Sequence, residues 1–138
     1  MTSYQVSDTE TALQDLIASC HGAIYAYGVI ASQLVNSDAA LDAVARYRIK
    51  RDELLAQILT FDVTPSPARA AYELSSPVTG DASAKAAASF LEENACAHWA
   101  AALSYLPATL AATESKFLQS CALSSFNWSG IAKAFSSA

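Results

Sequence analysis

The sequence contains little glycine, little proline and little charge. It has four glycines and four prolines in 138 residues, and charged side chains make up 15% of the chain. Few breaks favour long uninterrupted elements, and a hydrophobic content of 53% argues against intrinsic disorder. A chain of this length can bury a core without crosslinks, so we predict one all-helical domain.

Cysteine is also scarce. Cys20, Cys96 and Cys121 form an odd set without a C-x-x-C spacing, which indicates neither a disulfide framework nor a zinc knuckle. The first residues, MTSYQVSDTE, have neither the basic nor the apolar region of an export signal, and no apolar run is long enough to span a membrane. We therefore expect a cytoplasmic protein.

Basic clusters and the common catalytic motifs are absent as well. The net charge is −5 and the eight Lys and Arg residues are scattered, so we expect no contact with nucleic acid or with an anionic membrane. None of the patterns GxGxxG, GxxxxGK[ST], GxSxG or HExxH occurs. The chain thus lacks the parts of familiar nucleotide-binding, serine-hydrolase and zinc-protease sites.

Apolar residues recur at the spacing of bundle helices. They alternate in steps of four and three in a first predicted helix, residues 8–34, which follows a capping box at Ser7 and Glu10. Further helices are predicted over residues 38–59, 81–106 and 109–135. The proline-rich segment 62–80 is long enough to run the length of the bundle. One long crossover between the second and third helices is typical of ferritin-like four-helix bundles.

Four segments of the chain resemble a known bacterial family. They are HGAIYAYG in the first helix, YRIKRDELL in the second, ARAAYELSSPV in the linker and FLEENACAHW in the third helix. In order and spacing, from about Leu13 to Trp99, they are similar to an alanine-rich, ferritin-like domain family of unknown function. The resemblance implies the fold far more firmly than an activity, because one fold can carry many functions.

The metal ligands of ferritin-like proteins are missing from the matching positions. The resemblance implies a glutamate where this chain has Cys20 and a histidine where it has Tyr47, and no E-x-x-H occurs in the chain. A di-iron site needs a glutamate from each of two helices and an E-x-x-H pair from each of two others. We therefore expect no di-iron centre and no other cofactor.

A different metal site is a second hypothesis. Cys20, Cys121 and His98 come from three predicted helices and are residue types that zinc binds. Free cysteine is more often a small buried apolar residue, and His98 is more often a hydrogen-bonded core histidine. His21 lies about 100° around the helix from Cys20, so this adjacent pair does not converge on one point.

The second helix carries charges where a core stripe should run. A buried guanidinium needs a carboxylate, so we predict that Arg48 or Arg51 forms a buried network with Asp52 and Glu92. The alternative is that the helix rotates and the arginines reach water. The candidate buried polar cluster comprises Cys20, Tyr27, Tyr47, Arg48, Arg51, Asp52, Glu92 and His98.

The first helix is apolar on its outer side too. Ala18, Gly22, Tyr25, Ala26 and Val29 lie opposite the core stripe. A helix that is apolar all round needs a second partner, so we predict a homodimer with this face near the contact. An ordinary alanine-rich exposed face is the alternative.

Three kinds of function remain open. The favoured one is a non-catalytic bundle that serves as an interaction or structural protein. The second is a ferritin-like protein that binds a metal or a small ligand through substituted residues such as Cys20, Tyr47 and His98. The third is an enzyme that uses the thiol of Cys20 or Cys121, which would need a nearby base and a lowered pKa.

Overall fold

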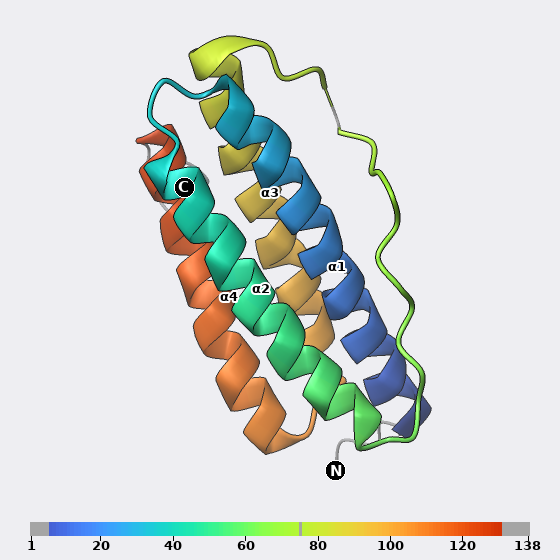
Figure 1. The fold of residues 1–138 in the computed structure, drawn as a ribbon. Coiled ribbons are helices and arrows are strands. Elements are labelled where there is room, and N and C mark those ends of the chain that lie inside the picture. Colours follow the sequence, from blue (N-terminus) through green and yellow to red (C-terminus); the bar gives the residue numbers. More distant parts are fainter. Residues whose placement is uncertain (1–5, 75, 131–138) are drawn as a thin grey trace.

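Four helices make up the structure, a computed structural model that describes residues 6–74 and 76–130. Their bounds are Val6–Gln33 for α1, Asp38–Leu59 for α2, Gly80–Leu103 for α3 and Ala108–Ser129 for α4. No strand occurs in the described residues. The chain is an all-α four-helix bundle (Figure 1), so the predicted fold class is confirmed.

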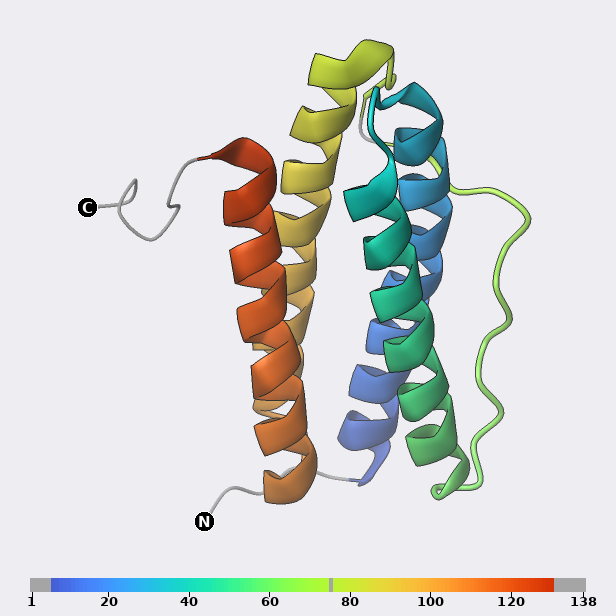
Figure 2. The ribbon, with the colours of Figure 1, turned by 60° about the vertical axis from the view of Figure 1, so that its left-hand side comes forward.

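One long connection sets the direction of the helices. Short turns join α1 to α2 and α3 to α4, so each of these pairs is antiparallel and the two pairs stand side by side (Figure 2). Residues 60–79 instead run back along the bundle beside α1, from the end of α2 to the start of α3 (Figure 1). As a result α2 and α3 point the same way, and α1 packs antiparallel to α3.

The long linker is pinned to α1. Near its start, the side-chain amide of Gln14 donates to the Thr64 carbonyl and accepts from the Ser66 N–H, both at 3.1 Å. Further along, the ring of Tyr72 lies 5.8 Å from the ring of Tyr25, centroid to centroid. These contacts hold a segment without regular structure against the outer side of α1.

The N-terminal ends of the helices differ little from the prediction. The bounds of α2 are those expected, and α3 begins at Gly80, one residue early. The first helix begins at Val6 rather than at residue 8, so Ser7 stands inside the helix and not at its cap. The side chain of Ser7 lies outside the described residues.

The third and fourth helices end earlier than expected. After Leu103, i to i+3 hydrogen bonds tighten the chain over residues 104–106, and Pro107, which has no N–H, follows. The last helix ends at Ser129 because Gly130 adopts the left-handed conformation with φ of 67°. The predicted continuation over residues 131–135 lies outside the described residues.

The core is formed by the inward stripes of the four helices. Its largest fully buried side chains are Leu13, Leu16, Ile17, Cys20, Tyr27, Ile30, Tyr47, Leu54, Ile58 and Trp99, with Glu92 among them. Buried alanines, among them Ala84, Ala88 and Ala95, keep the inward side of α3 slim. Within the described residues, no helix has both the length and the apolar character needed to cross a lipid bilayer.

Candidate functional site

A fully buried carboxylate lies at the centre of the bundle. Glu92, on α3, has an exposed fraction of 0% and accepts hydrogen bonds from all three other helices. Its Oε1 accepts from the Tyr47 hydroxyl at 2.6 Å, and its Oε2 from the Tyr27 hydroxyl at 2.5 Å and the Ser124 hydroxyl at 2.9 Å. The Arg46 guanidinium also donates to Oε2 and supplies the positive charge. We call these five residues the Glu92 network.

Arg46 connects the network to the surface. Its side chain is 25% exposed, and it also donates to the Ser120 hydroxyl at 3.1 Å. The guanidinium carbon lies 4.8 Å from the Tyr47 ring centroid and 5.3 Å from that of Phe117, within the range of cation–π contacts. Burial alone would lower the pKa of Arg46, but the Glu92 carboxylate beside it raises that pKa above its usual value. Arg46 therefore keeps its positive charge beside Glu92.

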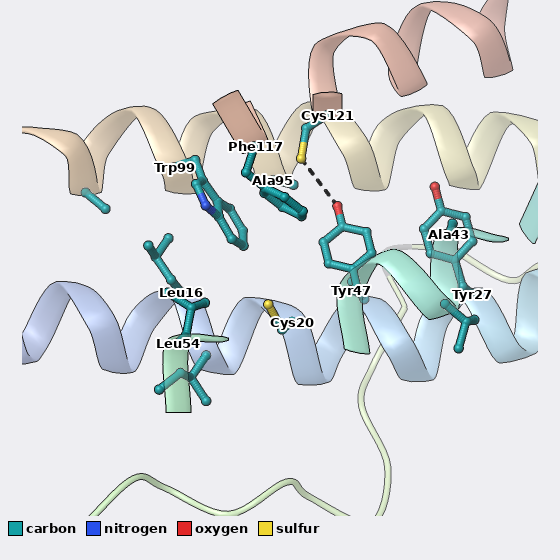
Figure 3. Packing of buried hydrophobic residues seen from close by; sticks show 14 of the residues in the cluster. Leu16, Cys20, Tyr27, Ala43, Tyr47, Leu54, Ala95, Trp99, Phe117 and Cys121 are labelled. Carbon is teal, nitrogen blue, oxygen red and sulfur yellow. Dashed lines mark hydrogen bonds between the residues drawn. The ribbon is translucent and has the colours of Figure 1, made fainter. Parts of the chain in front are cut away.

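Both tyrosines of the network act as neutral donors. Burial, followed by the negative charge of Glu92, raises the pKa of Tyr27 and of Tyr47 far above the usual range. The Tyr27 oxygen in turn accepts from the indole N–H of Trp128 at 3.0 Å. The Tyr47 oxygen lies 3.7 Å from the Cys121 sulfur, the contact drawn as a dashed line in Figure 3.

A second buried ion pair lies one helical turn further along α2. The Glu114 carboxylate on α4, 3% exposed, accepts from the Lys50 ammonium at 3.0 Å and from the Trp99 indole N–H at 2.9 Å. Burial alone would lower the pKa of Lys50, but its bonds to Glu53 and Glu114 raise it. The two buried carboxylates are thus each neutralised by a cation from α2.

Two of the cysteines belong to the same core. Cys20 on α1 and Cys121 on α4 are free thiols with no exposed surface, and Figure 3 shows both among the packed core side chains. Burial raises the pKa of each thiol to about 12. At neutral pH both are uncharged, so neither has the thiolate that nucleophilic attack requires.

The predicted polar cluster forms with a different arginine. Tyr27, Tyr47 and Glu92 come together as expected, and Cys20 is buried. Arg48, in contrast, is exposed.

Arg51 reaches only the neighbouring Asp52, its Nε lying 3.0 Å from an exposed carboxylate. The prediction that Arg48 or Arg51 reaches Glu92 is therefore wrong. The inward positions of α2 include Ala43, Tyr47 and Leu54, which turns residues 48 and 52 outward and leaves Arg51 half-buried.

Three charged residues of the buried ion pairs were missed that the spacing could have indicated. Lys50 stands in step with Ala43, Tyr47 and Leu54, and Arg46 precedes it by four residues on the same flank. On α4 the apolar positions Leu110, Phe117 and Cys121 continue through Glu114 at a step of four. A lysine and a glutamate on two core stripes are a sequence signal for a buried ion pair.

The three candidate zinc ligands do not converge. His98 is exposed on α3, with Nδ1 3.0 Å from the Asp15 carboxylate, whereas Cys20 and Cys121 are buried in the core. Among the residues that the structure describes, no group of three or more His, Cys, Asp or Glu side chains could hold a metal ion.

The outer face of α1 has a partner inside the chain. Ala26 is buried, and Gly22, Tyr25 and Val29 are half-buried, with the Tyr25 ring against the linker; Ala18 is exposed. The linker therefore covers part of the surface from which the homodimer was predicted.

Comparisons with known proteins give a matching family and a similar solved structure. A family model described as a domain of unknown function (DUF4439) matches residues 12–136. Among solved structures, the chain is similar to a conserved hypothetical protein, rv2844, from Mycobacterium tuberculosis, with 26% sequence identity and a TM-score of 0.87. That alignment covers 94% of this chain and 93% of the other. No curated protein matches the chain.

Replacing Arg46 by methionine should lower the free energy of unfolding by about 3 kcal/mol, because the buried Glu92 charge loses its counterion. Arg51→Met, on the same helix, is the matched control and should cost less than about 1 kcal/mol, since the Asp52 carboxylate that Arg51 contacts is exposed. Urea unfolding at neutral pH measures both. Equal losses would show that Arg46 does not hold the Glu92 charge.

The buried thiols should resist modification in the folded protein. Because a pKa of about 12 leaves the thiols of Cys20 and Cys121 protonated, their reaction with a disulfide reagent at pH 8 should be about a thousandfold slower than in the unfolded chain. The half-buried Cys96 should react first. Counting the released chromophore before and after adding urea measures this, and rapid native-state labelling of Cys20 or Cys121 would contradict it.

Proposed function

The chain belongs to the family described as a domain of unknown function (DUF4439), and we propose that it is a non-catalytic helical bundle that serves as an interaction or structural protein. The observation that carries the proposal is the Glu92 network. A carboxylate that accepts four hydrogen bonds from the protein is occupied as a structural group. In this proposal the bundle needs no cofactor.

The side chains at the centre do not fit a pair of iron ions. Glu92 accepts one hydrogen bond at Oε1 and three at Oε2 from its own donors, and Glu114 accepts from Lys50 and Trp99. Arg46 and Lys50 would also repel a cation placed between the two carboxylates. We infer that internal positive charges stand where ferritin-like proteins hold metals.

The surroundings of the two core cysteines do not support an enzyme with a thiol nucleophile. The polar group beside the Cys121 sulfur is the Tyr47 hydroxyl, which is itself held protonated. Burial raises the pKa of both core thiols, the opposite of what a nucleophilic cysteine requires. Three free cysteines also support a reducing compartment such as the cytoplasm.

The interaction surface that we propose lies on α2. Leu41 and Ile49 are 55% and 62% exposed, and with Ala45 between them they are spaced four residues apart on one face. A stripe of this kind on an exposed helix is suited to pairing with the same stripe of a second copy. The homodimer predicted from the sequence would then use α2 in place of the partly covered outer face of α1.

Protein purified without a chelator should contain iron, manganese and zinc well below one equivalent, because both buried carboxylates already have cations. Elemental analysis measures the content, and a thermal melt with each added metal should show no shift in Tm. The control variant Glu92→Gln tests whether any metal that is found binds at Glu92. Stoichiometric metal that disappears in this variant would overturn the proposal.

Light scattering at micromolar concentration should give the mass of a dimer for the natural chain. Ile49→Glu should give a monomer, because a charge in an apolar contact is costly to desolvate. Arg48→Glu, at the exposed position next to it, is the control that changes charge without removing an apolar group. A clean monomer for the natural chain would remove the homodimer from the proposal.

A further inference from the structure

A hollow of about 490 Å³ lies between α1, α3 and the linker. Its lining residues are distinct from the Glu92 network. Small side chains form much of its floor, among them Gly22 and Ala26 on α1 and Ala87 and Ala95 on α3. A Cβ atom added to Gly22 would meet no heavy atom within 4 Å, so the space above this residue is open.

The residues that α1 and α3 contribute to the hollow are polar at one end and apolar at the other. The alignment of the two antiparallel helices is shown by hydrogen bonds from His98 to Asp15 and from Val35, just after α1, to Asp81. Ser19, Asn94 and His98 therefore line the end near the start of α1, and Ile30, Ala87 and Phe90 line the other end. From Ser19 to Ile30 the helix rises about 16 Å at 1.5 Å per residue. The cavity has the length and the gradient of a small amphipathic molecule.

The polar end is suited to a head group that donates hydrogen bonds. The Nδ1 atom of His98 donates to the Asp15 carboxylate at 3.0 Å, which fixes the orientation of the imidazole at this end. Glu73, which follows Tyr72 on the linker, adds a carboxylate to the lining, whereas no lysine or arginine lines the hollow among the described residues. An amine or a hydroxyl group would be favoured here, and a carboxylate would be repelled.

The linker supplies an aromatic side to the hollow. Tyr72 lines it and is held in place by its ring contact with Tyr25 and by the Arg69 backbone N–H, which donates to its hydroxyl at 2.8 Å. Irregular connections as long as residues 60–79 are uncommon in compact domains and usually have a function. A cavity of this volume, apolar with a few convergent polar groups, is typical of small-ligand sites.

We propose that this hollow binds a small amphipathic molecule with an apolar body and a hydrogen-bond-donating head, a primary amine or an alcohol. The head lies at His98 and the body extends along Ala26 toward Ile30. This site is separate from the metal-free core on which the proposed function rests, so one can fail without the other.

The probe for the test is N-phenyl-naphthylamine, whose fluorescence rises in an apolar site and whose N–H can donate a hydrogen bond at the polar end of the hollow. Titration into the natural chain should give saturable binding to one site. Dodecylamine and dodecanol, kept below their micellar concentrations, should displace the probe. Dodecanoate should compete about tenfold less well, because the lining offers its charge a carboxylate, Glu73, and no lysine or arginine among the described residues. Equal competition by dodecanoate would overturn the head-group assignment.

Two glycines of α1 provide a matched pair of variants. Gly22→Met fills the hollow and should weaken probe binding by at least about tenfold, since the added side chain occupies the apolar volume. Gly28→Met lies on the same helix, is exposed and also meets no atom within 4 Å, but does not line the hollow. It should bind the probe as the natural chain does.

Both variants replace a mid-helix glycine with a better helix former, so both should fold at least as well as the natural chain. Circular dichroism and Tm check this directly. Absence of saturable binding by the natural chain, or equal affinities of the two variants, would overturn the proposal.

Discussion

The need to satisfy the charge of Glu92 inside the bundle constrains the rest of the structure. A carboxylate removed from water costs several kcal/mol unless it is paired and hydrogen-bonded. Here the donors come from α1, α2 and α4, so no helix can slide along or rotate about its axis without leaving the charge exposed to an apolar core. The Lys50–Glu114 pair repeats the constraint one turn away. Together the two pairs specify the register of four helices whose apolar stripes alone would tolerate several.

The same pairs explain how the two halves of the bundle are joined. Each half is an antiparallel helix pair, and buried alanines on α3 let it pack against both α1 and α4. Between α2 and α4 the link is made by long side chains, with Arg46 reaching Ser120 and Lys50 reaching Glu114. The ring of Phe117 fills the space between these cations, 5.3 Å and 5.1 Å from their charged groups. Between α2 and α4, ion pairs and aromatic packing therefore hold the helices together, in place of interdigitating apolar side chains.

The sequence predicts the fold well and the site only in part, for reasons that particular residues make plain. Helix bounds and the crossover follow from spacing, proline and glycine, which act locally. The buried tyrosines and Glu92 also follow, because they lie on unambiguous stripes. The arginine was assigned wrongly because Leu41, 55% exposed, marks a false apolar stripe on α2, whereas the true one runs through smaller residues at Ala40 and Ala43. An exposed leucine thus shifts the apparent phase of the helix by about one residue, or 100°.

The inner and outer faces of α1 differ in their polar contacts and in the space that they leave open. On the inner face, Cys20 and Tyr27 are committed to a core in which no buried side-chain polar atom of the described residues lacks a hydrogen-bond partner. The polar groups of this core are thus used in contacts with one another. On the outer face, Gly22 and Ala26 leave space that a larger residue would fill, and the linker crosses that space instead of packing into it. The outer face of α1 is therefore the side suited to binding a small molecule. It borders an unfilled hollow that has polar side chains of α1 and α3 at one end.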